Sequence, residues 1–496
     1  MRILMQMGAV LLCCGSTLAF AKSPAHCYVI GDTSDSKPMH TYGSQQNPYG
    51  SLGDVQADPD CVVINVLYSD IPLDGGIVLK DGQRIEGKKS KKGALPKITN
   101  SAGIGIILAR NNRLKNLHVF DTWLYGIAGS PEIQFTGGDI IIQKVLVTGA
   151  NQSGGFDAFG IMSSLAIAPA EDMKLRIKNS EIGEANAPSI GIAQLNGHAD
   201  IRISNTTVRD QGHIPGGNET SPGIAIVALG ISSIDAAVLN TSVSNIGDGA
   251  LSNSDGLLLL NQGSGAMNVK VDGYHYSNPD GGGALQTSTG IEMGFFASSG
   301  GGSFNGTVKN SVIEDAWYTG IQILDQYSGG GNTLTAQIKN NQINNCGGGI
   351  QAFTSYTPFS SMYVDISDNT IDTTDDRGFG LGDGIEIAAV DGPANIFEAR
   401  IEGNSVLNAA GDSLIFVLRN ASVQSAQLDA GLGGLGSAGQ NRIIGGAGAN
   451  IVSDGFEVSA ANNWWGSDTG PAVVVELNGG TVDVDPFLTT DPNPNP

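Results

Sequence analysis

Apolar and polar residues alternate over short segments through most of the chain, and one phrase returns at regular intervals. Its clearest copies are Gly290-Ile291-Glu292-Met293, Gly320-Ile321-Gln322-Ile323, Gly349-Ile350-Gln351-Ala352 and Gly384-Ile385-Glu386-Ile387. In each copy two apolar residues stand two positions apart with a polar residue between them, which is the alternation of a β-strand with one face in a core. The pattern predicts strands and places the polar residue of each copy on their outward face.

The phrase is one unit of a longer repeat. A glycine followed by an apolar residue recurs from Gly103 to Gly384 in steps of between 23 and 35 residues. Ankyrin and tetratricopeptide repeats have similar periods, but they require helical periodicity, and each period here holds two or three short alternating segments instead. The spacing therefore indicates a coil built from strands.

A second repeat lies between the copies of the first. Its members are strand, bend and strand, as in Ile338-Lys339-Asn340-Asn341-Gln342-Ile343 and Ile366-Ser367-Asp368-Asn369-Thr370-Ile371. Asparagine tolerates the left-handed backbone of a sharp bend. If the coils stack in register, such asparagines can also form ladders of side-chain amides.

These repeats resemble those of the right-handed parallel β-helix proteins of the pectin-lyase-like superfamily, over about residues 62 to 470. The segment from Asn462 to Pro471, with Trp464-Trp465-Gly466, is similar to the one that closes many such helices. The resemblance implies an all-β fold: a single right-handed parallel β-helix of about 11 to 12 coils with N- and C-terminal caps.

The chain divides into four predicted parts. Residues 1–21 are predicted to be a signal peptide because a basic start and an apolar run end in Ala19-Phe20-Ala21. Residues 22–61 form a cap segment, residues 62–470 the β-helix, and residues 471–496 an extension with a disordered end. A lipoprotein signal at Cys13 or Cys14 is the alternative to cleavage. The expected location is secreted or periplasmic.

The composition limits the classes of partner that the protein is expected to bind. The formal net charge of -22 argues against nucleic acid and anionic membranes as partners. Outside the signal, no run approaches the roughly 20 apolar residues that span a bilayer. Export permits a disulfide between Cys27 and Cys61, with Cys346 buried as a small apolar residue. The basic run Lys88–Lys92 is a local exception and is expected to be a solvated loop.

Candidate chemistry follows from the outward row. Stacking the coils places Leu258, Glu292, Gln322, Gln351 and Glu386 in line, and carboxylates and amides hydrogen-bond sugar hydroxyls. The expected substrate-binding residues are the two amides and aromatic residues of the same coils: Gln322, Gln351, Trp317, Tyr318, Tyr327 and Phe353. The alternative is that these are ordinary outward polar residues and loop packing.

The distance between the carboxyl groups of the row tests whether the chain could be a glycoside hydrolase. A glycoside hydrolase needs two carboxyl groups about 5 to 9.5 Å apart, whereas Glu292 and Glu386 lie three coils apart, about 14 Å at the coil rise. Asp383, at the start of the strand of Glu386, and Asp325, one coil from Glu292, are therefore the proposed catalytic partners. Whether the chain is an enzyme stays open; if it is one, a polysaccharide lyase or glycoside hydrolase is expected.

Motifs of the known enzymes on this fold are matched only in part. Asn253-Ser254-Asp255-Gly256 resembles the first motif of polygalacturonases, but their Gly-His-Gly is absent and Arg176-Ile177-Lys178 lies upstream, in the wrong order. Pectate lyases combine calcium-binding aspartates with an arginine, and Asp372, Asp375 and Asp376 beside Arg377 are the nearest imitation. No cofactor is expected, with calcium at this loop as the alternative to a solvated turn.

Two functions follow. The first is a secreted protein that binds, and as an enzyme would also process, an extended polysaccharide or cell-surface glycan along the outward face of coils 256–391. The second is a non-catalytic, adhesin-like structural rod. No residue pattern indicates the oligomeric state.

Overall fold

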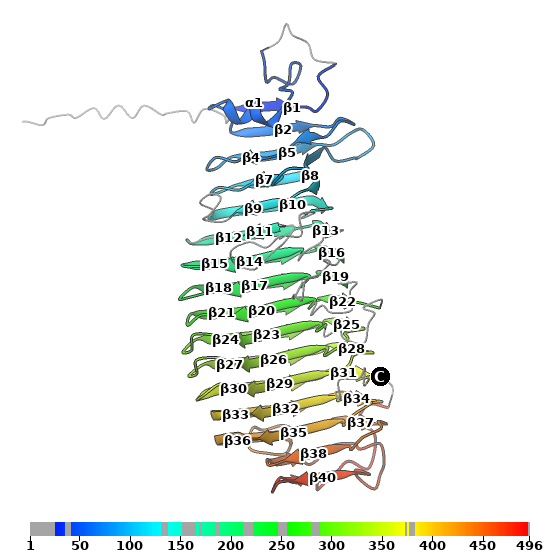
Figure 1. Cartoon of the computed structure of the whole chain (residues 1–496). Coiled ribbons are helices and arrows are strands. Elements are labelled where there is room, and N and C mark those ends of the chain that lie inside the picture. Colours follow the sequence, from blue (N-terminus) through cyan, green and yellow to red (C-terminus); the bar gives the residue numbers. More distant parts are fainter. Residues whose placement is uncertain are drawn as a thin grey trace, which may run out of the picture.

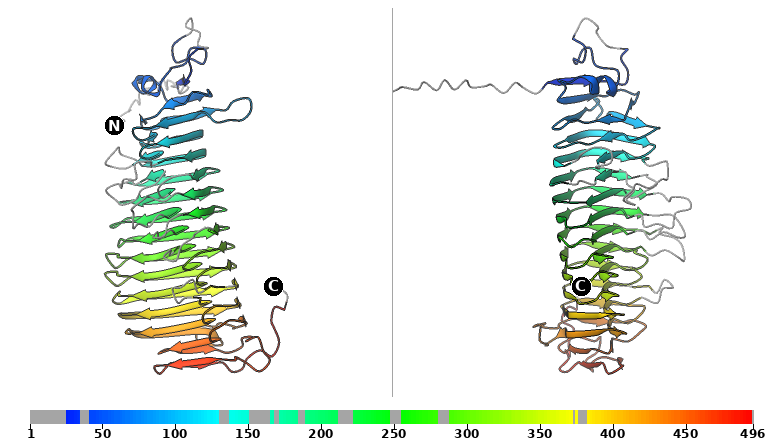
Figure 2. Two further views of the ribbon diagram at one scale, coloured as in Figure 1. Left: turned by 45° about the vertical axis from the view of Figure 1, so that its right-hand side comes forward. Right: turned by 60° about the vertical axis from the view of Figure 1, so that its left-hand side comes forward.

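The computed structural model describes residues 25–34, 41–129, 137–150, 165–167, 171–183, 189–211, 222–246, 255–279, 288–372, 374–375 and 382–494. Its strands stack coil upon coil into a rod (Figure 1), and two further views show the same stack from other sides (Figure 2). All the strand pairings are parallel, and each strand pairs with the equivalent strand of the next coil, as between β23 (Ile291–Phe296) and β26 (Ile321–Gln326). The prediction of an all-β parallel β-helix is confirmed.

One sheet runs the length of the rod and carries the Gly-apolar phrase. Among the described residues it has 14 strands: β4 (Ile77–Val78), β7 (Ile106–Ile107), β9 (Ile127–Gly129), β11 (Leu165–Ile167), β14 (Ile190–Gln194), β17 (Ile224–Ala228), β20 (Leu257–Asn261), β23, β26, β29 (Ile350–Ser355), β32 (Ile385–Val390), β35 (Leu414–Arg419), β38 (Ile451–Asp454) and β40 (Val474–Leu477). The stack extends past the predicted 11 to 12 coils, and its last three strands, β35, β38 and β40, begin without the glycine of the repeated phrase.

The second sheet has 27 strands in two columns. The first column is β1 (His26–Val29), β2 (Val63–Leu67), β5 (Arg84–Lys88), β8 (Arg113–Thr122), β10 (Gly138–Thr148), β12 (Met173–Lys178), β15 (His198–Ser204), β18 (Ser233–Leu239), β21 (Ala266–Asp272), β24 (Ser303–Lys309), β27 (Thr333–Lys339), β30 (Ser360–Ser367), β33 (Pro393–Glu402), β36 (Ser422–Gly431), β39 (Glu457–Ala460) and β41 (Thr481–Asp483). The second column is β3 (Leu73–Asp74), β6 (Lys97–Asn100), β13 (Glu181–Gly183), β16 (Thr207–Gln211), β19 (Ser242–Ile246), β22 (His275–Ser277), β25 (Val312–Glu314), β28 (Gln342–Asn344), β31 (Thr370–Asp372), β34 (Ser405–Leu407) and β37 (Arg442–Ile444), and β8 and β10 continue through both.

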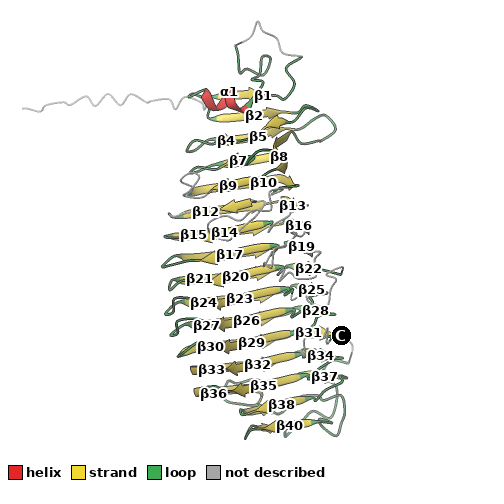
Figure 3. Cartoon of the chain, in the orientation of Figure 1, coloured by secondary structure: helices red, strands yellow, loops and turns green. Residues whose placement is uncertain are grey.

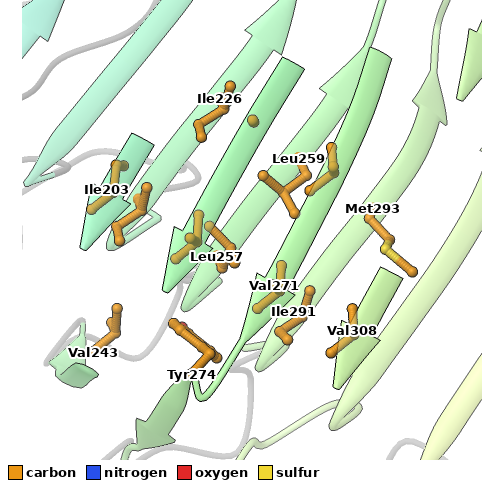
Figure 4. Packing of buried hydrophobic residues seen from close by; sticks show 14 of the residues in the cluster. Ile203, Ile226, Val243, Leu257, Leu259, Val271, Tyr274, Ile291, Met293 and Val308 are labelled. Atoms are coloured by element: carbon orange, nitrogen blue, oxygen red, sulfur yellow. The ribbon is translucent and has the colours of Figure 1, made fainter. Parts of the chain in front are cut away.

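The core fills the inside of the rod with side chains from all three columns. Leu257, Leu259, Ile291 and Met293 of the 14-stranded sheet pack in it (Figure 4) and are fully buried. The glycine of the repeated phrase is explained by close approach: a Cβ on Gly320 would lie 2.5 Å from a methyl carbon of Ile343 and 2.9 Å from the next coil's carbonyl. Only glycine fits there without movement.

At each bend between the two columns, one residue turns the backbone and the next residue contributes its side chain to a ladder. Asn340 and Asp368 have left-handed φ angles of 56° and 55° and make the bend. The next residues point inward and form the predicted amide ladder: Asn341, Asn369, Asn404, Asn441 and Asn463. From Asn369 onward, each Oδ1 accepts from the backbone N–H and from Nδ2 of the preceding rung, at 2.9–3.1 Å. These buried amides are therefore fully hydrogen-bonded.

The ends of the rod are closed differently. At the N-terminal end, α1 (Leu52–Ala57), the one helix among the described residues (Figure 3), buries Leu52 and Val55, and a disulfide joins Cys27 to Cys61. At the other end the sheets continue to Asp483, beyond the predicted limit of residue 470. Arg442 Nε donates to Asp491 Oδ2 at 2.8 Å, so the start of the tail predicted to be disordered is attached to the rod. The predicted signal peptide lies outside the described residues.

Cys346 is buried, as predicted. In the described part of the chain, no helix is long and apolar enough to cross a membrane.

Candidate functional site

The five residues of the predicted row lie on five successive strands of the 14-stranded sheet, beginning with Leu258 on β20, which pairs with Glu292. Glu292 pairs with Gln322, Gln322 with Gln351, and Gln351 with Glu386. Their neighbours on either side along each strand, such as Ile321 and Ile323, point into the core. The structure therefore brings these four residues together on the outward face of β23, β26, β29 and β32, with the two glutamates three coils apart.

The row is bonded along its length. Gln322 Nε2 donates to Gln351 Oε1 at 2.6 Å, and Gln351 Nε2 donates to Glu386 Oε2 at 2.6 Å. Gln322 and Gln351 are only 5% and 8% exposed, which is less than a solvent-facing strand predicts. The two amides thus orient Glu386 as an acceptor at the end of the chain of hydrogen bonds.

Both glutamates are shifted toward the protonated form. Burial, and then the charge of Asp255, raise the pKa of Glu292 well above its usual value. Burial also raises the pKa of Glu386, while the bond from Gln351 and the charge of Arg419 oppose the rise. A raised pKa favours the protonated form, and a protonated carboxyl group can donate to a sugar oxygen.

Tyr318 lies over the row. It belongs to the turn before β26, where its backbone N–H donates to Ser288 O at 2.9 Å. Burial first, and then the charge of Glu386, raise the pKa of its hydroxyl, while hydrogen bonds with Gln322 and Gln351 lower it. The Tyr318 hydroxyl is therefore within hydrogen-bonding reach of the two amides. Trp317 precedes it and is partly buried; its backbone N–H donates to Ser288 Oγ at 3.1 Å.

The two proposed catalytic partners are placed elsewhere. Asp325 is three residues from Gln322, so alternation puts it on the opposite side of β26, where it is 1% exposed and accepts from Asn332 Nδ2 at 3.2 Å. Asp383 precedes β32, and its Oδ1 accepts from the backbone N–H of Asp412 at 2.7 Å. Asp325 therefore lies on the inner side of β26, and Asp383 holds the backbone at a coil corner.

A ladder of aromatic rings runs along the far end of the same strands, and we call Phe296, Tyr327 and Tyr356 the aromatic ladder. Tyr327 and Tyr356 stack with ring centroids 5.2 Å apart, and Phe296 meets Tyr327 edge to face at 5.9 Å. Both tyrosines are more than half exposed. Phe353, midway along β29 on the face of Gln351, is partly exposed. Of the predicted aromatic residues, Tyr327 therefore offers the most open ring.

Two charged residues of the site were not among the predicted ones. Arg419, exposed at the end of β35, pairs with Val390 and acts electrostatically on both Glu386 and Tyr356. Asp255 is 3% exposed and accepts from Thr289 N–H at 3.1 Å; burial raises its pKa to about 7. The partial motif Asn253-Ser254-Asp255 was the one sequence signal for Asp255.

The proposed calcium loop is only partly described. Asp372 Oδ1 accepts from Asn408 Nδ2 at 2.9 Å, and Asp375 N–H donates to Cys346 O. Asp376 and Arg377 lie outside the described residues, so calcium stays a prediction. Within the described ranges, the one cluster of metal-type ligands is Cys27, Asp58 and Cys61, whose cysteines form the disulfide.

When the chain is compared with known proteins, the similarity found is to solved structures. No family model and no curated protein matches the chain. The catalytic unit of a GH87 α-1,3-glucanase from Streptomyces thermodiastaticus is 12% identical over 86% of this chain and 64% of that one, with a TM-score of 0.42. A tailspike protein mutant of E. coli bacteriophage HK620, in complex with a hexasaccharide, is 12% identical over 92% and 76%, with a TM-score of 0.39. The Azotobacter vinelandii mannuronan C-5 epimerase AlgE4 A-module is 13% identical over 76% and 93%, with a TM-score of 0.35. This chain spans about two thirds of the glucanase unit, and its fold is established by its own strand pairing.

Proposed function

We propose that this chain is an exported glycan-binding protein that holds an extended polysaccharide along the outward face of β23 to β35. The observation that carries the proposal is the aromatic ladder, because exposed rings in line along a rod provide flat apolar surfaces for the C–H faces of sugars. The disulfide between Cys27 and Cys61 fits an oxidising compartment.

The polar row supplies the second kind of contact. Glu386, Arg419 and the hydroxyl of Tyr318 provide an acceptor, a donor and a group that can do either, near the ladder's strands. A glycan lying across the strands would have rings along one side and polar groups along the other, because each coil carries both. This combination of apolar surface and a few oriented polar groups is what ligand sites share.

Binding is better supported than cleavage. Glu292 can act as a proton donor, but hydrolysis also needs a second carboxyl group about 5 to 9.5 Å away that meets the sugar. Asp255, whose charge acts on Glu292, is buried beneath the sheet, and Asp325 and Asp383 are engaged in the coil corners. We therefore propose Glu292 and Glu386 as glycan-binding residues. Whether they also process the bound glycan is a separate test.

The test is a panel of neutral and acidic oligosaccharides, with affinity measured by titration calorimetry for the wild type and for Tyr327→Ala and Tyr356→Ala. Tyr42→Ala is a matched control because Tyr42 is equally exposed and pairs with another ring, Tyr49, at the N-terminal end. Loss of binding in the ladder variants alone supports the proposal. Absence of binding to every glycan in the panel would refute it.

A structural rod is the second candidate, and one observation favours it. The amides of Gln322 and Gln351 bond to each other and to Glu386, as in the internal asparagine ladder, and this could be their whole role. Under this hypothesis Gln351→Ala lowers the melting temperature while no variant of the outward face changes glycan binding. Measuring both quantities on the same variants separates the two functions.

A further inference from the structure

Phe359 is an exposed ring on the same turn as Tyr356, between β29 and β30. It is 54% exposed, as much as the two tyrosines of the aromatic ladder. Tyr327 and Tyr356 stack on each other, so one face of each ring is already covered. Among the described residues no aromatic ring packs against Phe359. Of the exposed rings at this edge of the sheet, Phe359 is therefore the one that is free of other rings.

The backbone holds Phe359 in a conformation that is unfavourable for a bulky residue. Its φ of 57° is left-handed, which phenylalanine rarely adopts. Its carbonyl accepts from Asn395 Nδ2 at 2.8 Å, and Asn395 is the extra residue of a β-bulge between β30 and β33. Bulges of this kind re-aim side chains. Together, the strain and the bulge at an exposed ring indicate a role beyond packing.

The turns of the two preceding coils stack on the turn of Phe359 and leave open space. Gly331 N–H donates to Pro358 O at 3.1 Å, so Gly331 lies against the residue before Phe359. Gly331 and Gly301 are exposed and left-handed, with φ of 71° and 74°. In the described part of the chain, a Cβ on Gly331 would come no nearer than 4.0 Å to another atom, and one on Gly301 would meet nothing within 4 Å. The ring provides the contact surface, and the glycines leave room for a ligand beside it.

The turns that carry these residues are uncharged. Three turn segments contain no acidic or basic residue: 297–302, 327–332 and 356–361. In the two coils that follow, Asp391 and Arg419 both act on Tyr356, one group of each sign. An acidic ligand therefore finds no excess of positive charge here, whereas the C–H face of an uncharged sugar needs only an apolar ring.

We propose, resting on the glycan binding proposed above, that the ligand is a neutral polysaccharide and that Phe359 is a specificity-determining residue that stacks on one of its sugars. The bound chain runs along the rod over the three turns. Tyr356 and Phe359 contact it with their rings, and the space at Gly301 and Gly331 accommodates the neighbouring sugar.

The experiment measures affinity by titration calorimetry for a set of neutral oligosaccharides and a set of oligouronates of the same lengths. We expect the neutral set to contain the ligand that binds most tightly, and Phe359→Ala to lose about tenfold in affinity for it. Leu432→Ala is the matched control, because Leu432 is 57% exposed and has a left-handed φ of 58° in a later coil. This control should bind as the wild type does.

A second variant adds a side chain instead of removing one. Gly331→Asn keeps the left-handed backbone, which asparagine tolerates, and fills the open space. It should lose about tenfold or more in affinity while its melting temperature stays near that of the wild type. Gly82→Asn is its control, since Gly82 has a φ of 73° with nothing within 4 Å of an added Cβ, in the corresponding turn before β5.

The outcomes separate this inference from the proposed function. If Tyr356→Ala loses binding while Phe359→Ala and Gly331→Asn bind as the wild type does, the glycan site stands and the role of Phe359 is refuted. Equal or tighter binding of the oligouronates refutes the neutral ligand class. If the wild type binds no member of either set, the proposed function fails together with this inference.

Discussion

Tyr327 and Tyr356 stack nearly parallel, with 8° between their ring planes, although both stand at bends with a left-handed φ of 53°. The equivalent bend position is occupied by Ala297 in the preceding coil and by Asp391 and Asn420 in the following ones. A bulky residue in this conformation costs roughly 1–2 kcal/mol. Strain of this kind is typical of functional surfaces, where an exposed side chain has a role beyond stability.

Removing one ring of the ladder should weaken glycan binding. For Tyr356→Ala we expect roughly a tenfold loss of affinity, the equivalent of about 1.4 kcal/mol, because the apolar sugar face loses one of its two parallel rings. Titration calorimetry with the best ligand of the glycan panel gives the value. The unfolding midpoint of the same variant must stay near that of the wild type; a large drop would show that the loss came from unfolding.

The bend itself predicts a stabilising substitution. Ala297 is exposed and has a φ of 50°, which asparagine adopts more readily than alanine. Ala297→Asn should therefore raise the free energy of unfolding by up to about 1 kcal/mol, measured by denaturant titration. Ala297→Val, which is β-branched, should lower it. If both variants shift stability in the same direction, the bend is not the cause.

Asp255 predicts a pH dependence of stability. In the unfolded chain this carboxyl group ionises near its usual pKa of about 4, but in the fold burial raises its pKa to about 7. Between these values the folded state keeps a proton that the unfolded state has released, so raising the pH lowers stability until both are ionised above pH 7.

The isosteric variant Asp255→Asn removes this titration while an amide oxygen can still accept from Thr289. We expect the wild type to lose on the order of a few kcal/mol more than the variant between pH 4 and pH 7.5. Urea unfolding at several pH values measures the difference. Asp235→Asn, at an exposed site, serves as the control and should keep the slope of the wild type.

The hydrogen bonds of Asn404 predict how much the buried amide ladder contributes to the free energy of unfolding. Its Nδ2 donates to Ile366 O at 2.9 Å and to Asn441 Oδ1 at 3.1 Å, and its Oδ1 accepts from Asn369. Asn404→Ala leaves several buried groups without partners, at about 1–3 kcal/mol each. Denaturant unfolding should show a loss of several kcal/mol. Asn395→Ala, whose bond to Phe359 O is exposed, should cost far less.

The alternation of residues such as Ile321, Gln322 and Ile323 was sufficient to predict the strands, their stacking and the outward row, because a two-residue period and a fixed bend leave few other folds. The same alternation also puts Asp325 on the inward face of its strand, because Asp325 stands an odd number of residues from Gln322. The bond between Gln322 and Gln351 and the influence of Arg419 on Glu386 depend on side-chain conformations across coils. No local pattern encodes those conformations.

The amide ladder has a consequence for how the rod comes apart. From Asn341 to Asn463 every rung grips the next coil, whereas at the same position of earlier coils Thr206 and Thr241 turn their hydroxyls back to their own strand. Each coil of a solenoid is held by its neighbours alone. Hydrogen exchange should therefore be slowest and most uniform in the five coils from Asn341 to Asn463, which open as one block, while the N-terminal coils fray singly. Under force applied at its two ends, the rod should therefore unfold first in the N-terminal coils and last in the coils from Asn341 to Asn463.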